Sequence, residues 1–187
     1  MEPDPATIDQ QPDTSQAQQS PKAQNGSGGL EPGLSAASDK TLRMSYRIGR
    51  GEQGVLTFEP YKSTLLPYWK FRSVPIAKTS SQSLWERFLQ YETEDDFVGM
   101  DMARKFIQMG MTRAKRYANH KGGRKYDANG KELDKSTGHK GMKEKEEASQ
   151  VFRQVWERCK KHDGYLRRKD AFLAEQKAWD KAKKSRA

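Results

Sequence analysis

No aromatic residue occurs in the first 40 positions of this chain, although the whole sequence holds 7 Phe, 7 Tyr and 4 Trp. Residues 1–40 are rich in Gln, Ser, Pro, Gly and Asp, and their apolar residues follow no regular period. A segment of this composition cannot bury enough apolar surface to offset the entropy of ordering its backbone. We therefore predict a disordered tail over 1–40, either an interaction segment or a solvating leader, followed by one domain over 41–187.

Beyond the tail, apolar residues recur with the period of an α-helix. In the clearest case, Met102, Phe106 and Met109 share one face, and the acidic residues 94–96 stand where a helix macrodipole favours negative charge. Helices are predicted over 76–91, 97–119, 143–162 and 166–183. The sequence therefore predicts a mainly α fold of three to four helices in a single compact domain.

A short β or extended element is predicted at the start of the domain. Residues 46–48 and 55–58 are rich in β-branched and aromatic side chains, and they flank the glycine-rich turn 49–54. Residues 120–142 hold five glycines and no apolar period, which indicates a long loop of the kind that is often functional. The predicted core includes four aromatic side chains, Trp69, Phe88, Phe106 and Trp156.

The charge and the hydrophobic content of the chain exclude some classes of protein. The net charge is +10, and because residues 1–39 carry −5, the rest of the chain carries +15. Hydrophobic residues make up only 33%, and no apolar run approaches the ~20 residues of a membrane-spanning helix. The single cysteine, Cys159, excludes an internal disulfide, and no apolar leader follows Met1. We expect an intracellular protein of the cytoplasm or nucleus that does not enter membranes.

The glycine-rich turn matches a phosphate-binding pattern in its spacing only. Gly49, Gly51 and Gly54 fit Gly-x-Gly-x-x-Gly, and Arg50 adds a cation, so the turn is a candidate secondary anion-binding site. A dinucleotide fold requires a helix that opens at the last glycine, whereas residues 55–58 have the composition of a strand. A protein kinase requires further motifs and a far longer chain. The pattern alone is therefore a weak indication of nucleotide binding.

The strongest functional signal is the stretch 103–126, which carries eight Lys or Arg residues and no acid. Helix-dipole compensation accounts for one or two cations near a C-terminus, but not for this number. The stretch runs into a glycine-containing loop, where basic side chains and backbone N–H groups converge and a tyrosine offers a stacking face. The candidate anion-binding residues are Arg104, Lys105, Arg113, Lys115, Arg116, His120, Lys121, Arg124, Lys125 and Tyr126. The alternative is a solvated face that binds nothing specific.

Catalytic and metal chemistry have little support. Cys159 and His162 share one predicted helix, but no second ligand pair has zinc spacing, and Cys159 fits a small buried residue. Asp96 and Asp101 fit ordinary acids of the first helical turns. No nucleophile, base and orienting group can be assembled, so we expect no cofactor and no metal. The sequence favours a non-catalytic protein without deciding whether it is an enzyme.

Six segments together resemble a family of domains of unknown function, domain of unknown function 4385, from bacteria, their viruses and fungi. The segments are YRIGRGEQGVL (46–56), EPYK (59–62), LLP (65–67), WKF (69–71), DFVGMDMARKF (96–106) and TRAKRYANHKGGRKY (112–126). The resemblance covers about 42–180 and implies one compact domain that contains both the glycine-rich turn and the basic loop. The family has no established activity, so the resemblance assigns no functional residue.

Two functions from different classes fit these observations. The leading hypothesis is a non-catalytic domain that binds a polyanion, nucleic acid above all, through residues 104–126. The alternative is an enzyme or sensor for a small phosphorylated ligand held between the glycine-rich turn and the basic loop. A broad convex basic face would favour the first, and a deep pocket joining Arg50, Arg116, His120 and Arg124 would favour the second.

Overall fold

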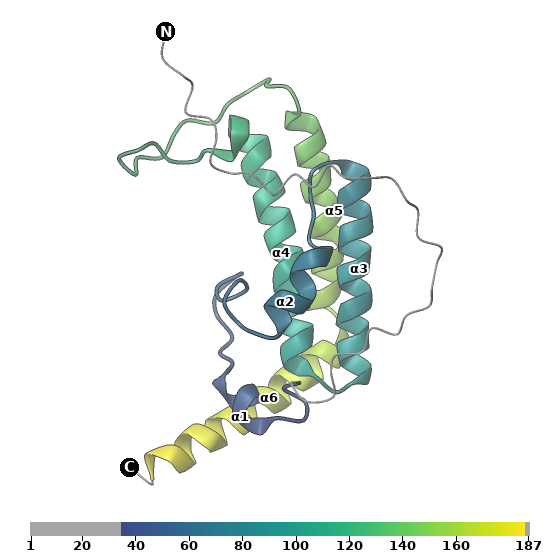
Figure 1. The fold of residues 1–187 in the computed structure, drawn as a ribbon, viewed down its shortest axis with the longest axis vertical. Helices are drawn as coiled ribbons and strands as arrows, with labels where there is room; N and C mark the ends of the chain where they lie inside the picture. The colour runs from purple at the N-terminus through teal and green to yellow at the C-terminus, as the bar shows by residue number, and fades with distance from the viewer. Residues whose placement is uncertain (1–34, 186–187) are drawn as a thin grey trace.

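The structure, a computed structural model, describes residues 35–185, and the predicted disorder of residues 1–34 lies outside this part of the chain. Three long helices form an antiparallel bundle, and a fourth continues from its lower end (Figure 1). The bundle helices are α3 (Val74–Thr93), α4 (Phe97–Asn119) and α5 (Met142–Lys160), and the fourth is α6 (Asp163–Lys184). Short helices are α1 (Lys40–Ser45), α2 (Tyr61–Leu65), and the 3-10 turns η1 (Leu66–Tyr68) and η2 (Lys121–Gly123).

The four long helices confirm the mainly α prediction, whereas the predicted β element is wrong. The described residues contain no strand, and their one isolated bridge joins Tyr126 to Glu132. Residues 50–57 instead form consecutive turns, closed by hydrogen bonds such as Val55 N–H to the Glu52 carbonyl at 3.2 Å. Val55 is buried, so burial against the bundle overrides its preference for a strand.

Helix α4 is the centre of the core. Its residues from Phe97 to Ile107 are all buried, because α3, α5 and the N-terminal segments pack on different sides of it. Phe88 and Phe106 are fully buried as predicted, whereas Trp69 and Trp156 are only half-buried. Helices α4 and α5 pack closely at Gly110, where an added Cβ atom would lie 2.5 Å from the ring of Phe152.

The last residues of the predicted tail are part of the fold. Ala36 is completely buried, and its N–H donates to the Tyr61 hydroxyl at 2.8 Å. Ser35 donates to a carboxylate oxygen of Asp96 at 2.9 Å. Asp39 begins α1 as its N-cap by accepting from Leu42 N–H at 3.0 Å. Residues 35–40 therefore pack on the domain, which corrects the boundary predicted at residue 40.

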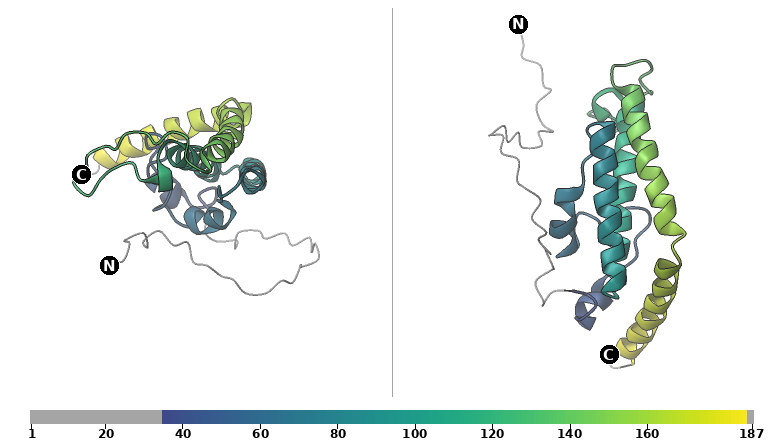
Figure 2. Two further views of the ribbon diagram at one scale, coloured as in Figure 1. Left: turned by 90° about the horizontal axis from the view of Figure 1, so that it is seen from above. Right: turned by 90° about the vertical axis from the view of Figure 1, so that its right-hand side faces the viewer.

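The N-terminal segment holds α6 in place. The Arg43 guanidinium pairs with Glu175 at 2.9 Å, and Arg47 pairs with Asp180 at 2.9 Å. Between these pairs, Gln176 donates to the Tyr46 carbonyl at 2.7 Å. Figure 2 shows α6 leaving the end of the bundle, so this clasp, formed by residues 43–47 with α6, fixes its direction. Within residues 35–185, no helix is long and apolar enough to cross a membrane.

Candidate anion-binding cleft

Two of the predicted surface cations, Arg104 and Lys105, lie in the core instead. They surround Asp101, which is fully buried. Arg104 Nε lies 2.8 Å from Asp101 Oδ1, and Lys105 Nζ lies 3.7 Å from Oδ2. Tyr46 and Tyr165 donate to the same carboxylate at 2.5 and 2.7 Å. Neither cation is exposed to a ligand, so both leave the predicted anion-binding set.

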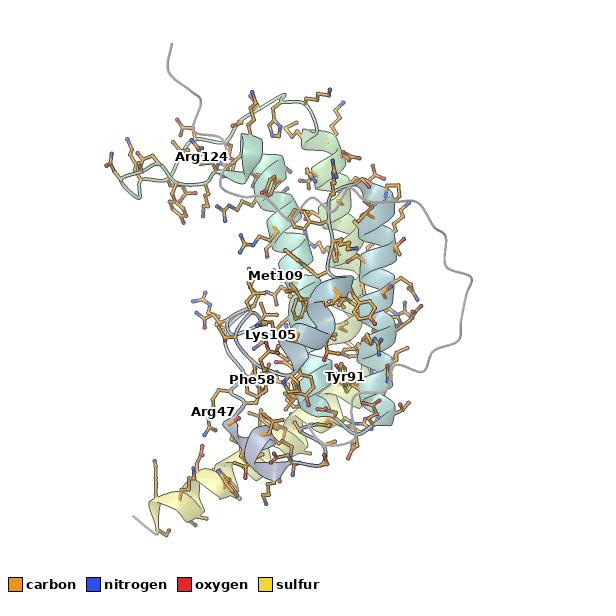
Figure 3. The ribbon with its side chains drawn as sticks, viewed as in Figure 1. Arg47, Phe58, Tyr91, Lys105, Met109 and Arg124 are labelled. Carbon is orange, nitrogen blue, oxygen red and sulfur yellow. The ribbon has the colours of Figure 1, made fainter. Side chains whose placement is uncertain are left out.

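Burial and charge oppose each other in this Asp101 cluster. Burial disfavours the ionised carboxyl, but the Arg104 guanidinium and the two tyrosine hydroxyls outweigh it and hold the pKa of Asp101 below its usual range. Burial also lowers the pKa of Lys105, whose ammonium donates to the Gln53 carbonyl at 3.0 Å. Figure 3 shows Lys105 on α4 beside the glycine-rich segment. This contact anchors the turn to α4.

Five of the remaining predicted residues line a cleft of about 780 Å³, which we call the basic cleft: Arg113, Lys115, Arg116, His120 and Lys125. Its walls come from the C-terminal half of α4, from α5 and from the connection between them, residues 120–141. Six Lys or Arg residues line it, against two glutamates, Glu52 and Glu132. The six are Arg113, Lys115, Arg116, Lys125, Lys135 and Arg153.

The connection 120–141, which we call the arm, is an ordered element. Leu133 N–H donates to the Lys125 carbonyl at 2.8 Å, and Asp127 N–H donates to the Lys131 carbonyl at 2.9 Å, which makes a narrow ribbon. Ser136 N–H donates to the Asn119 carbonyl at 2.9 Å and holds the returning chain against α4. Figure 1 shows the arm projecting from the upper end of the bundle, where its basic residues border the cleft.

Four of the cleft cations have no carboxylate partner. Lys115 pairs with Glu146 at 2.6 Å and Lys125 pairs with Glu132 at 3.4 Å. Within residues 35–185, no ion pair holds the other four, which are Arg113, Arg116, Lys135 and Arg153. Cations gathered in one concave site repel one another, and low-dielectric walls strengthen the field that they produce. The basic cleft is therefore electrostatically prepared for an anion.

Two uncharged polar groups of the cleft are also without partners. His120 is 4% exposed, and its Nδ1 atom is buried with no hydrogen bond to any described residue. The same holds for the indole Nε1 of Trp156, whose ring is covered on one side by Lys160 Nζ at 3.9 Å. Buried polar groups are normally hydrogen-bonded, so unpartnered ones in a cleft mark positions where a ligand can supply the partner.

Three other predicted residues lie on the arm but outside the cleft lining. Lys121 and Arg124 are exposed, and Tyr126 is 49% exposed. Figure 3 shows Arg124 where the arm leaves the bundle. Arg116 Nε donates to the Gly123 carbonyl at 2.5 Å, and Gly123 sits so close to the Tyr117 ring that an added Cβ atom would lie 2.6 Å from it. A glycine at this position lets the arm bring its backbone to Arg116.

The glycine-rich turn does not contribute a phosphate cradle to the cleft. Gly49, Arg50, Gly51 and Gly54 are absent from its lining, and the turn reaches it only through Glu52, which accepts a hydrogen bond from Thr112 at 2.7 Å. Within the turn, Gln53 N–H already donates to the Arg50 carbonyl at 3.2 Å. The turn therefore adds a negative charge to one edge of the cleft.

Sequence reasoning missed three residues of the cleft, Lys135, Arg153 and Trp156. Ser149, Arg153 and Trp156 recur at spacings of four and three, which places them on one face of α5. That periodicity was available as a signal. Their position opposite Arg113 and Arg116 depends on how α4 and α5 align, which the sequence alone does not specify.

The acids and the cysteine considered for chemistry have structural roles. Asp96 caps α4 by accepting from Gly99 N–H at 2.9 Å, as predicted, whereas Asp101 belongs to the buried cluster rather than to a capped first turn. Cys159 is buried, as expected, and burial raises its pKa to about 12. His162 Nε2 lies 3.4 Å from Glu92 Oε2. Among residues 35–185, no three His, Cys, Asp or Glu residues are arranged to hold a metal ion.

These observations define the protein as a helical-bundle domain with an open cleft rich in unpaired cations. A sequence model of one family, described as domain of unknown function (DUF4385), matches residues 34–175, and the chain belongs to this family. The match begins one residue before Ser35, so it includes the segment that packs on Tyr61 and Asp96. Comparisons with curated proteins and with solved structures give no match.

Proposed function

We propose that this protein is a non-catalytic nucleic-acid-binding domain that holds a phosphate backbone in the basic cleft. The observation that carries the proposal is the presence in one cleft of four cations, from α4, α5 and the arm, that have no carboxylate partner within residues 35–185. Lys and Arg that contact phosphates release condensed counterions, which makes such binding favourable and strongly dependent on salt. The +15 carried by residues 40–187 adds long-range attraction for any polyanion.

The length of the cleft favours a strand over a single phosphate group. Phe152 packs over Gly110, so Trp156 lies about one turn below Gly110, whereas His120 lies ten residues above it. At 1.5 Å per residue, the two ends of the cleft are about 20 Å apart. Arg113, Arg116 and Arg153 lie between them, spaced along two helices rather than around one point. This arrangement suits successive phosphates of a single strand.

A small phosphorylated ligand is the second candidate, favoured by the concavity of the site and by the unpartnered His120. Of the four residues expected to converge for that function, Arg116 and His120 line the cleft, whereas Arg50 and Arg124 do not. The glycine-rich turn supplies Glu52 rather than a cation. The proposal therefore keeps nucleic acid first and small phosphorylated ligands second.

The test measures the salt dependence of binding to a single-stranded oligonucleotide. The double variant Arg113→Gln and Arg153→Gln removes two unpaired cleft cations that make no ion pair, so the fold should survive. For single strands, each lost phosphate contact lowers the slope of log K against log salt by about 0.7, so the double variant should lose about 1.4 units.

The matched control removes the same charge elsewhere. The double variant Lys78→Gln and Arg167→Gln changes exposed residues of α3 and α6 that lie outside the cleft lining. It should keep most of the wild-type slope. Equal loss in both double variants would show diffuse attraction without a site, and absence of any salt-dependent binding by the wild type would refute the proposal.

A further inference from the structure

The two ends of the basic cleft differ in chemistry. Met111 and the half-buried Trp156 give the lower part apolar and aromatic surface. The upper part, where α4 meets the arm, gathers Arg116, His120 and Lys135 with Lys125 close by. A ligand that fills the cleft therefore meets cations along its length and at its upper end, and apolar and aromatic surface at its lower end.

The upper end of the cleft presents hydrogen-bond donors to a ligand. The bond from Arg116 Nε to the Gly123 carbonyl fixes the guanidinium and leaves its two terminal nitrogens without an ion pair. His120 follows directly, because its N–H donates to the Arg116 carbonyl at 2.9 Å, and its ring lines the cleft with a buried, unpartnered Nδ1. Lys135 comes from the returning side of the arm. Three side chains from two elements thus meet at one end, and among residues 35–185 none of them has a carboxylate partner.

We infer that this upper end, with Arg116, His120 and Lys135, binds a terminal phosphate monoester, so that a nucleic-acid strand enters the cleft by its phosphorylated end. The inference rests on the proposed function and specifies which part of the strand the cleft recognises. An internal phosphodiester carries one charge, whereas a monoester carries about −1.5 to −2 at neutral pH and offers three acceptor oxygens. A bidentate guanidinium, an imidazole and an ammonium can together donate to all three of these oxygens.

The experiment compares strands of identical sequence that differ only at their ends. Three strands carry a 5′ phosphate, a 3′ phosphate or hydroxyls at both ends, with the fluorophore on an internal base so that both ends stay free. The wild-type full-length chain should bind one phosphorylated strand about tenfold more tightly than the hydroxyl strand, as expected for one or two charged hydrogen bonds. The preferred end identifies the direction of the strand, and a nucleoside monophosphate competitor tests the free nucleotide as a source.

Two variants assign the preference to this end of the cleft. Lys135→Gln changes an exposed arm residue and should keep the fold, and His120→Gln removes the unpartnered ring. Both should lower the preference for the phosphorylated strand, measured as the ratio of the two affinities within each variant, to about twofold. Lys135→Gln also removes one cleft cation, so its affinity for the hydroxyl strand should fall by the loss of that single contact. The control Lys140→Gln removes an exposed arm lysine outside the cleft lining and should keep the full preference.

The possible failures are distinct. Equal affinity of the wild type for all three strands, with a normal salt slope, would overturn the terminal-phosphate inference and leave the proposed function standing. A preference that survives in both cleft variants would also overturn it. Absence of binding to every strand and to the nucleotide would refute the proposed function together with the inference.

Discussion

Lys105 and Asp101 are both fully buried, and each is tolerated in the core because the other groups of the cluster surround it. Burying a charge is costly unless it is paired and hydrogen-bonded. Asp101 accepts hydrogen bonds from two tyrosines and a guanidinium. Its negative charge therefore compensates the buried cations and binds the two hydroxyl groups. Removing it leaves Arg104 and Lys105 buried without compensation.

Asp101→Asn should therefore destabilise the protein by about 3–5 kcal/mol, as for other buried pairs that lose one partner. Lys105→Met is the matched comparison, because it keeps the Asp101–Arg104 pair and the volume of the side chain. It should cost less than about 1.5 kcal/mol. Urea denaturation of both variants measures the difference, and equal losses would show that the carboxylate is not central.

The Asp101 cluster also predicts that the free energy of unfolding depends on pH. The pKa of Asp101 is lower in the folded protein than in the unfolded chain, so the cluster stabilises the fold fully above the unfolded value of ~3.9. That contribution is lost as the pH falls through the lower, folded value. The gap in unfolding free energy between wild type and Asp101→Asn should thus be constant near neutral pH and shrink below about pH 4. A gap independent of pH down to acid unfolding would contradict this assignment.

The Asp101 cluster also shows why the burial of these single residues could not be predicted from the sequence. Arg104 and Lys105 were assigned to a basic surface because they stand in a stretch otherwise full of exposed cations. Asp101 stands three positions before Arg104 and four positions before Lys105. An acid at these spacings lies beside the cations on the surface of a helix. The spacing could indicate a pair, but the burial of that pair depends on Tyr46 and Tyr165 from distant segments.

At the scale of elements, one close approach in the bundle is where Gly110 of α4 meets Phe152 of α5. Replacing a helix glycine by alanine normally stabilises a helix by about 0.5–1 kcal/mol. Here the new methyl group would collide with a fully buried ring, and overpacking of this kind costs about 1–3 kcal/mol. Gly110→Ala should therefore lower the melting temperature, and a rise would show that α4 and α5 can separate without cost.

Long helices were predictable because their apolar period extends over several turns, as in Phe97–Asn119, whose bounds match the prediction. The conformation of segment 46–58 was not predictable. Tyr46 and Val55 prefer strands, and the local sequence does not show that burial on α4 outweighs this preference. The short α1 and α2 span too few residues to show a period. The cleft was predictable on its α4 side and at His120 and Lys125 of the arm. Lys135 of the arm and the facing residues of α5 were not, because their positions depend on tertiary packing.

For the molecule as a whole, the boundary of the domain is testable by truncation. Removing residues 1–34 should leave the melting temperature unchanged, because their composition offers too little apolar surface to offset the entropy of ordering them. Removing residues 1–39 also deletes the buried Ala36 and the Asp39 cap of α1. A lost N-cap costs about 0.5–2 kcal/mol and a lost hydrogen bond about 1 kcal/mol. The longer truncation should melt several degrees lower, and equal melting of both would contradict the packing of residues 35–39.

The clasp between residues 43–47 and α6 has a consequence for biosynthesis. Arg43 and Glu175 are separated by 132 positions, whereas α3, α4 and α5 are neighbours in the chain. Contacts between distant positions require closure of a large loop and form late. On the ribosome the segment 43–47 emerges before the bundle helices, whereas its partners on α6 emerge after them. We expect the bundle to gain amide protection in pulsed hydrogen exchange while α1 still exchanges, so that the beginning of the domain becomes fixed only after α6 has been made.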